Sequence, residues 1–172
     1  MKKVLLVIFL ISTTALFAQT QKIGYVNTQT IMEQYSGAIA AQSKVDGILS
    51  KLTAQRDSMA QSYQSALDNY QKQQGTMTDD IKAQTEQRIV QQQQDLQKFQ
   101  QEKFSQPNGE IYVKNEQIMG PVRDKVKTAI NEVAKQMGYS FIFDKSSEVV
   151  LLYADDAFDI TLEVLLKLKK GK

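Results

Sequence analysis

The spacing of apolar residues predicts a long helical section in the middle of the chain, from residue 38 to residue 118. Apolar side chains recur there at alternating intervals of four and three, the repeat of a coiled-coil seam. The first run of this repeat is Val45, Leu49, Leu52, Met59, Tyr63, Ala66 and Tyr70, with Arg56 in the one missing position between Leu52 and Met59. The second run is Ile81, Thr85, Ile89, Gln92, Leu96 and Phe99. Gly75 is expected to end the first helix and Thr78 or Asp79 to cap the second, which predicts an antiparallel hairpin with its tip near residues 75–80.

The returning leg of this hairpin contains a glutamine-rich run and a break. Seven of the eleven residues from 91 to 101 are glutamine. Such a run fits either a disordered tract or a helix; Leu96 and Phe99 continue the seam through it, and glutamine forms helices well, so helix is favoured. Pro107 and Gly109 then predict a kink or break, which serves either as a flex point or as a local kink without a function.

The segments on either side of the hairpin mix short strands with helices. Residues 22–26, 139–143 and 149–154 are rich in β-branched, aromatic and aliphatic residues and predict three strands. Thr28 or Thr30 is expected to cap a short helix after the first strand. An amphipathic helix that stops at Gly138 precedes the second strand, and Pro121 fits either its first turn or a kink. A last helix follows Asp159, its expected N-cap.

The sequence therefore predicts an α+β fold, mostly α, in which a small β-rich body carries a long antiparallel coiled-coil arm inserted in it. The expected divisions are a signal peptide at 1–18, a first part of the body at 19–37, the arm at 38–118 and a second part of the body at 119–172. A body of about 73 residues with exposed strand edges is only marginally stable alone. Self-association of the bodies is expected to supply the missing stability and to cover the strand edges.

The first eighteen residues have the pattern of an export signal. Lys2 and Lys3 precede an unbroken apolar run, Val4 to Ile11, and small or neutral residues lead to Ala18, after which cleavage is expected. The alternative is an uncleaved anchor, but the apolar run is short for a membrane span. Export places the protein in the periplasm or beyond. The chain contains no cysteine, so packing or assembly must hold the fold together.

Charge and composition narrow the chemistry further. The formal net charge of +2 falls to zero once Lys2 and Lys3 leave with the signal, which argues against nucleic acid and against strong membrane binding. Histidine, cysteine and tryptophan are absent, and no nucleotide-binding or nucleophile motif is present. The acidic pairs Asp79-Asp80 and Asp155-Asp156 fit helix and turn capping better than a metal site. No enzyme activity, cofactor or metal is expected.

Three stretches carry a resemblance to a known family: KIGYVNTQTIM after the signal, VKTAINEVAKQMGYSFIFD, and DITLEVLLKLK near the end. With the order of elements, they resemble the Skp (OmpH) family of periplasmic chaperones. The resemblance implies a homotrimer whose bodies pool their strands and whose three arms surround a cavity. It also implies an ATP-independent holdase that keeps unfolded outer-membrane proteins from aggregating and passes them to the outer-membrane assembly machinery.

Two sets of site residues follow from this interpretation. The residues expected in the trimer body are Ile23, Tyr25, Val26, Phe141, Phe143, Val149, Leu151, Tyr153, Ile160 and Leu165. The residues expected to bind clients on the arm are Met59, Tyr63, Tyr70, Met77, Phe99 and Phe104. For Met59, Tyr63, Tyr70 and Phe99 the alternative is a place in the seam, whereas Met77 and Phe104 are the better candidates for exposure.

The arm departs from the family in its charge. It holds nine basic and ten acidic residues, whereas well-known members of the family are strongly basic. Electrostatic capture of clients should therefore be weak and insensitive to salt. One rival interpretation is a structural coiled-coil adaptor that binds one folded partner at the tip of the arm. An envelope-lipid-binding protein is a second rival, which the neutral arm disfavours.

Overall fold

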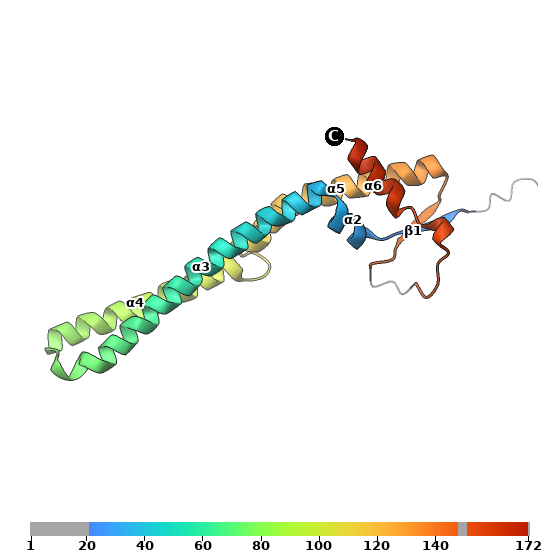
Figure 1. Ribbon diagram of the computed structural model, residues 1–172. Coiled ribbons are helices and arrows are strands. Elements are labelled where there is room, and N and C mark those ends of the chain that lie inside the picture. Colours follow the sequence, from blue (N-terminus) through green and yellow to red (C-terminus); the bar gives the residue numbers. More distant parts are fainter. Residues whose placement is uncertain (1–20, 148–150, 172) are drawn as a thin grey trace, which may run out of the picture. The chain divides into compact units, whose positions relative to one another are not determined.

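The computed structural model describes residues 21–147 and 151–171 (Figure 1). The predicted signal peptide at 1–18 and the predicted body residue Val149 lie outside these residues. The chain divides into two compact units. The body unit comprises residues up to 31 and from 128 onward, and the arm unit comprises residues 32–127.

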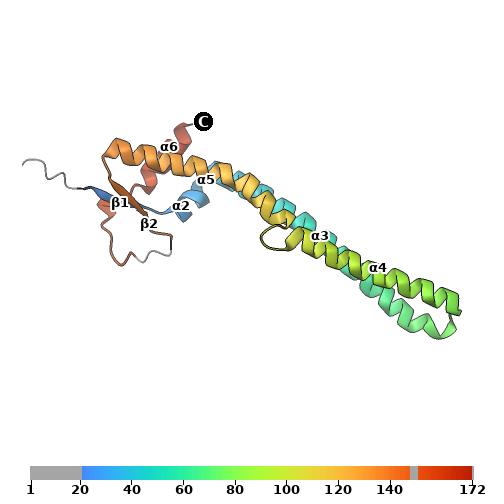
Figure 2. The same ribbon diagram turned by 180° about the vertical axis from the view of Figure 1, so that it is seen from behind.

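The arm unit is built on the predicted helical hairpin. Helix α3 (Ser36–Gln73) ends in a single 3₁₀ turn (Gln74–Thr76), and α4 (Asp79–Phe104) begins after Thr78. Helices α3 and α4 lie side by side in both views (Figures 1 and 2). The glutamine-rich run is therefore helical, and both the hairpin and the position of its tip are confirmed.

The predicted break separates α4 from α5 (Glu110–Met137). Helix α5 starts well before Pro121 and contains this proline in its interior, so of the two alternatives for Pro121 the first helical turn is wrong. A proline inside a helix costs about 3 kcal/mol. Packing offsets this cost, because Met119 is buried in one cluster with Ala41 and Val45 of α3. Four partly buried residues pack against that cluster: Met32, Ile111, Ile118 and Val122.

The seam of the hairpin follows a slightly different register from the predicted one. Leu49 is 42% exposed, whereas its neighbour Ile48 is half-buried and stands in the seam. On α4 the predicted first seam residue, Ile81, is 51% exposed. The later seam residues Ile89 and Phe99 are buried as predicted.

The body unit contains a two-stranded parallel sheet. Strand β1 (Ile23–Val26) pairs with β2 (Phe141–Asp144), so that Ile23 faces Phe141 and Tyr25 faces Phe143. Helix α2 (Thr28–Gln34) follows β1, and Asn27 rather than either threonine caps it, since its Oδ1 accepts the Thr30 N–H at 3.0 Å.

The third predicted strand is not formed over the part of it that the structure describes. Residues 151–155 have no regular secondary structure and lead into a 3₁₀ turn (Asp156–Phe158). The last helix, α6 (Thr161–Lys170), follows Asp159 as predicted. Ile160 occupies the N-cap position, and Asp159 instead accepts the Thr161 N–H at 2.8 Å.

The core of the body unit lies around α6. Ile31, Ile160 and Val164 are the largest fully buried side chains among the described residues. Leu165 and Leu168 are also buried on the same helix. The C-terminal part of α5 contacts α6 through the Glu132–Lys167 ion pair at 2.8 Å. Gly138 ends α5 in a left-handed conformation, with φ of 72°, as its predicted role at the helix stop requires.

Candidate functional site

The sheet of the body unit has one face that carries large apolar side chains into solvent. Alternation along paired strands places Ile23, Tyr25, Phe141 and Phe143 on this face. Ile23, Phe141 and Phe143 are 49%, 52% and 43% exposed, whereas Tyr25 is buried. Three large side chains exposed together on one short sheet form the kind of patch that marks an interaction surface.

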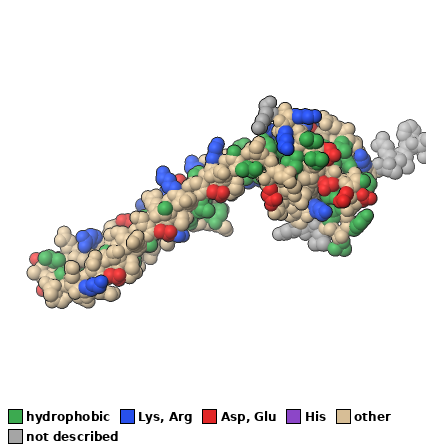
Figure 3. Space-filling view, viewed as in Figure 1, with side chains coloured by type: hydrophobic (Ala, Val, Ile, Leu, Met, Phe, Trp, Pro, Cys, Tyr) green, Lys and Arg blue, Asp and Glu red, His purple; other side chains and the backbone are tan. Residues whose placement is uncertain are grey.

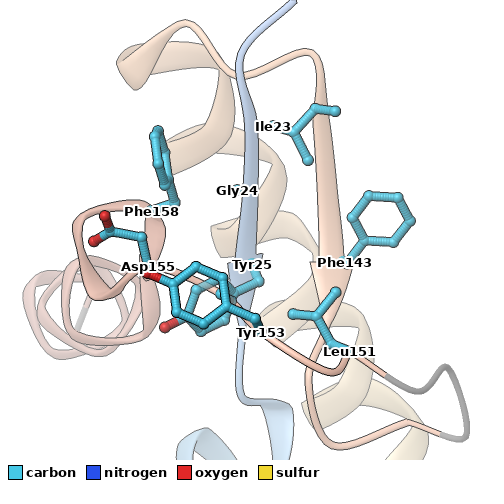
Figure 4. A pocket seen from close by; sticks show the side chains of 9 residues that line it. Ile23, Gly24, Tyr25, Phe143, Leu151, Tyr153, Asp155 and Phe158 are labelled. Carbon is cyan, nitrogen blue, oxygen red and sulfur yellow. The ribbon is translucent and has the colours of Figure 1, made fainter.

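This face continues into an open pocket of about 180 Å³. Its walls come from β1, β2 and residues 151–158, and Figure 4 shows Phe158 on one side of β1 with Phe143 and Leu151 on the other. Tyr153 also lines the pocket but is 83% exposed, and its neighbour Leu152 is 93% exposed. The exposed face thus extends beyond the sheet onto the segment that was predicted to be a strand.

The two edges of the sheet differ in whether another segment of the chain pairs with them. Outside the sheet, β1 makes a parallel bridge from Tyr25 to Asp159, and the Tyr25 carbonyl accepts the Ile160 N–H at 3.0 Å. The other edge of β2 pairs with no residue that the structure describes. An unpaired strand edge offers hydrogen-bonding groups to another strand.

Four of the predicted trimer-body residues are buried in the protomer's own core. Tyr25, Val26, Ile160 and Leu165 are all at most 5% exposed. The Tyr25 hydroxyl donates to Asp156 at 3.3 Å. Burial, followed by the nearby carboxylates of Asp159 and Asp156, raises the pKa of Tyr25. These residues hold the sheet in place, while Ile23, Phe141, Phe143, Leu151 and Tyr153 are available to a partner.

Asp144, at the end of β2, joins the strand to the start of α2. Its carboxylate accepts from the backbone N–H of Thr28 at 3.2 Å and from the Thr28 hydroxyl at 2.5 Å. It also accepts from the N–H and hydroxyl of Ser146 at 3.0 and 2.7 Å. Burial by itself raises the pKa of Asp144, but these hydrogen bonds outweigh burial and hold the pKa below its ordinary value. Sequence analysis missed this network, although an aspartate two residues before a serine signals such a turn.

The predicted client-binding residues of the arm are only partly accessible. Met59, Tyr63, Tyr70 and Met77 are half-buried, and Phe99 is buried. Phe104 is also half-buried, and its ring centroid lies 6.3 Å from that of Phe99.

Charged groups surround this pair of aromatic rings. The Arg56 guanidinium lies 5.6 Å from the Phe104 ring and the Lys103 ammonium lies 6.0 Å from the Phe99 ring. The two phenylalanines therefore form one cluster beside the break. Phe104 is less accessible than its place next to the break suggested.

The arm unit also exposes apolar residues that the sequence analysis did not select. All of them lie off the seam that the structure shows: Ile39, Leu49, Ile81, Val90, Tyr112 and Val113. For Ile39, Val90, Tyr112 and Val113 the signal in the sequence is an apolar residue outside the predicted heptad positions, whereas Leu49 and Ile81 were themselves predicted to lie in the seam. Apart from the adjacent pair Tyr112 and Val113, they are separate from one another along the helices, so they offer scattered contacts.

The remaining surface of the arm is polar and carries little net charge. In Figure 3 the part built from α3 and α4 is mostly tan, with blue and red side chains distributed singly along it. Several glutamines hydrogen-bond an aspartate four residues later: Gln42 to Asp46, Gln64 to Asp68, and Gln91 to Asp95, at 2.8, 2.9 and 2.9 Å. Such pairs stabilise the helix and occupy the carboxylates.

The acidic pairs stand at the starts of turns and helices. Asp79 and Asp80 form the first turn of α4, and the Asp155 carboxylate accepts the Ala157 N–H at 2.9 Å. Within residues 21–147 and 151–171, no group of three or more acidic, histidine or cysteine side chains is arranged to hold a metal ion. No helix in the same residues is long and apolar enough to cross a membrane.

A small body whose two paired strands are separated in the sequence by a long helical hairpin defines the class of protein: an arm-bearing OmpH-like fold. The sequence profile of the family described as "Outer membrane protein (OmpH-like)" matches residues 22–168. The chain belongs to this family.

A solved structure agrees with the assignment. The chain is similar to an OmpH-like protein of Caulobacter crescentus CB15, a proposed outer membrane chaperone, with a TM-score of 0.71 and 16% sequence identity. The match covers 88% of this chain and 86% of that one. No curated protein sequence matches the chain significantly.

Proposed function

We propose that the protein is an ATP-independent holdase chaperone of the periplasm. In this proposal a homotrimer binds unfolded outer-membrane β-barrel proteins between its arms, prevents their aggregation and aids their delivery to the outer-membrane assembly machinery. Membership of the OmpH-like family and the chaperone assignment of the Caulobacter protein support the general role. The observation that carries the binding mode is an arm with scattered, accessible apolar side chains on a polar surface of nearly balanced charge.

The composition of the arm suits temporary binding. Each accessible apolar residue contributes little alone, and many weak contacts together hold a client that can still leave. Arms with nine basic and ten acidic residues attract a client weakly at long range, so the binding should depend little on salt. Methionine and aromatic side chains such as Met59, Tyr70 and Met77 adapt to clients of different sequence.

Trimer formation rests on the body unit. A two-stranded sheet is marginally stable in water, and this one exposes Ile23, Phe141 and Phe143 next to an unpaired edge of β2. Association with other copies would bury these side chains and would give the unpaired edge of β2 a partner. Leu151 and Tyr153, which line the adjoining pocket, would join the same interface.

The test is light scattering while a urea-unfolded outer-membrane barrel protein is diluted into buffer with the mature chain, residues 19–172. We expect aggregation to be suppressed near one trimer per client, at both low and high salt. A variant lacking residues 60–95 should remain a folded trimer without protecting the client, which controls for effects of the body. Absence of suppression at any ratio would contradict the holdase proposal and favour a structural adaptor.

A further inference from the structure

A polar groove runs along one side of the hairpin, between α3 and α4. It consists of two adjoining hollows of about 300 and 310 Å³, which share Ser62 and Gln92 in their walls. One hollow extends toward the tip as far as Gln73 and Met77, and the other reaches Ser58 and Asp95. Both lie entirely within the arm unit.

The two walls of this groove carry hydrogen-bonding side chains at helical spacing. The α3 wall is formed by Ser58, Ser62, Ser65, Asn69 and Gln73. The α4 wall is formed by Thr85, Arg88, Gln92 and Asp95. Most of these wall residues are exposed, whereas the half-buried Met59, Ala66 and Tyr70 lie deeper between them. Hydroxyl, amide and guanidinium groups supply both donors and acceptors, and small side chains keep the groove open.

The length of the groove fits a short extended peptide. Its α3 wall from Ser58 to Gln73 is about 22 Å long at 1.5 Å per residue. An extended chain covers that distance with about six or seven residues at 3.3 Å each. Sequence-independent recognition of such a chain requires partners for its N–H and C=O groups, because these are the groups that every unfolded polypeptide shares.

Gln92 provides an unused acceptor in the middle of this groove. Its side-chain amide nitrogen donates to the Ser62 hydroxyl at 3.4 Å. Its Oε1 is buried and accepts no hydrogen bond from any described residue. A buried acceptor without a donor is unfavourable. If the Gln92 side chain turns outward into the groove, Oε1 becomes accessible to a ligand that donates an N–H, which relieves this penalty.

We propose that this groove binds the extended main chain of an unfolded polypeptide through side chain–main chain hydrogen bonds. Gln92 turns outward from Ser62 so that its Oε1 accepts a peptide N–H, Arg88 and the serines donate to peptide carbonyls, and client side chains reach Met59, Tyr70 and Met77. This inference rests on the proposed function and specifies its mode of binding. It gives a neutral arm a means of holding clients without long-range charge attraction.

The direct test is the binding of a fluorescein-labelled, uncharged ten-residue peptide of alternating serine and valine to mature chain 19–172, followed by fluorescence anisotropy. A second peptide carries N-methyl groups at alternate peptide bonds, which removes N–H donors and leaves its side chains unchanged. We expect the methylated peptide to bind about tenfold more weakly, the equivalent of about 1.4 kcal/mol. Equal affinity for the two peptides would overturn the proposal in favour of side-chain contacts.

A matched pair of variants locates the site. Gln92→Leu removes the acceptor and places an apolar residue at a seam position, so the hairpin should remain folded and gain stability. Gln94→Leu makes the same change two residues away on the exposed surface, outside the groove. We expect Gln92→Leu to weaken peptide binding about tenfold and Gln94→Leu to leave it unchanged. Unchanged binding by Gln92→Leu, or equal losses in both variants, would contradict the proposal.

The aggregation assay on the same proteins separates the two hypotheses. If the unaltered chain protects clients and Gln92→Leu protects them equally well, the groove proposal fails while the holdase proposal stands. If the unaltered chain binds the unmethylated peptide selectively but protects no client, the holdase proposal fails and the groove stands as a peptide-binding site. Absence of both activities overturns both.

Discussion

The body unit and the arm unit are stabilised in opposite ways. In the body a few side chains are almost completely excluded from water, with Ile31, Ile160 and Val164 at 0% exposure, and hydrogen bonds join segments far apart in the sequence. In the arm most buried side chains retain about 7–9% exposure, although Ala38 and Val126 near the body end are at 1% and 4%. Between Leu52 on α3 and Phe99 on α4, which includes the tip, Ile89 is the only further buried residue among those that the structure describes. The body concentrates its stability, whereas the arm distributes it.

This difference explains why each unit suits its proposed role. A concentrated core fixes the geometry of a small sheet, so the sheet can present a defined apolar face to other copies. A distributed seam lets the arm lose or rearrange one contact without unfolding, because stability then comes from many small increments. Substitutions should accordingly have large effects in the body and small effects in the arm.

The largest effect is expected at the exposed face of the sheet. Phe141→Asp places a charge in the proposed interface and should weaken association more than 100-fold, leaving monomers in sedimentation velocity experiments. Phe141 is 52% exposed in the single chain, so the substitution creates no cavity in the protomer. Ser147→Asp, on an exposed residue after β2, is the control and should remain trimeric. A trimer that survives Phe141→Asp would mean that the subunits meet elsewhere.

The next largest effect separates the two cores. Ile160→Ala in the body should reduce the free energy of unfolding by about 2–5 kcal/mol, because it empties a fully buried site. Ile89→Ala in the arm, at a seam residue 7% exposed, should cost less, toward the lower end of that range at about 2 kcal/mol. Urea unfolding followed by circular dichroism at fixed protein concentration measures both. Similar losses for the two variants would remove the distinction between the units.

A smaller effect, with a characteristic pH dependence, is expected at Asp144. Asp144→Asn should cost about 1–2 kcal/mol at pH 7, since the hydrogen bonds from Thr28 and Ser146 favour the charged carboxylate. The pKa of Asp144 is lowered in the folded protein, so this stabilisation is fully present above about pH 5 and is lost as the pH falls below about 4.

The check on Asp144 is the unfolding free energy measured from pH 7 to pH 3. The difference between the unaltered chain and Asp144→Asn should shrink as the pH falls. A difference that stays constant would assign the effect to packing instead of to ionisation.

The smallest effect is expected on the surface of the arm. Gln64→Ala removes one hydrogen bond to Asp68 and should change stability by about 0.2–0.5 kcal/mol. Thermal unfolding of this variant beside Gln61→Ala, an exposed glutamine on the same helix, measures the contribution of the pair. A loss above about 1 kcal/mol would show that the arm depends on single contacts after all.

Regular periodic features of the sequence predicted the arm well. The tip at residues 74–78, the helical nature of the glutamine run and the break after Phe104 all follow from local rules. The register at Leu49 was wrong because Val45 allows the next seam residue at an interval of either three or four. Ala38 and Ala41 are buried in the same seam, and the repeat that they begin continues through Val45 to Ile48 and not to Leu49.

Features that depend on tertiary packing were harder to predict. Pro121 lies within α5 because the cluster of Met119 with Ala41 and Val45 carries the helix through it, which no local propensity reveals. Residues 151–154 have strand-forming side chains, yet a strand also needs a partner edge, and the sequence does not state which edge is free. The groove that Ser62 and Gln92 line was not predicted either, because Ser62 occupies an ordinary polar position of a helix and Gln92 was predicted only as a polar member of the seam.

The parallel pairing of β1 with β2 also determines the order in which this chain can fold. Thr28 and Asp144, which join the end of β2 to the start of α2, are 116 residues apart in the sequence. During synthesis β1 therefore emerges long before its partner, whereas the hairpin needs only neighbouring residues and can form in between. Contacts of such large sequence separation form slowly. Until the C-terminal segment is made, β1 has no partner strand, and during that interval the chain itself exposes an unpaired edge of the kind that leads to aggregation.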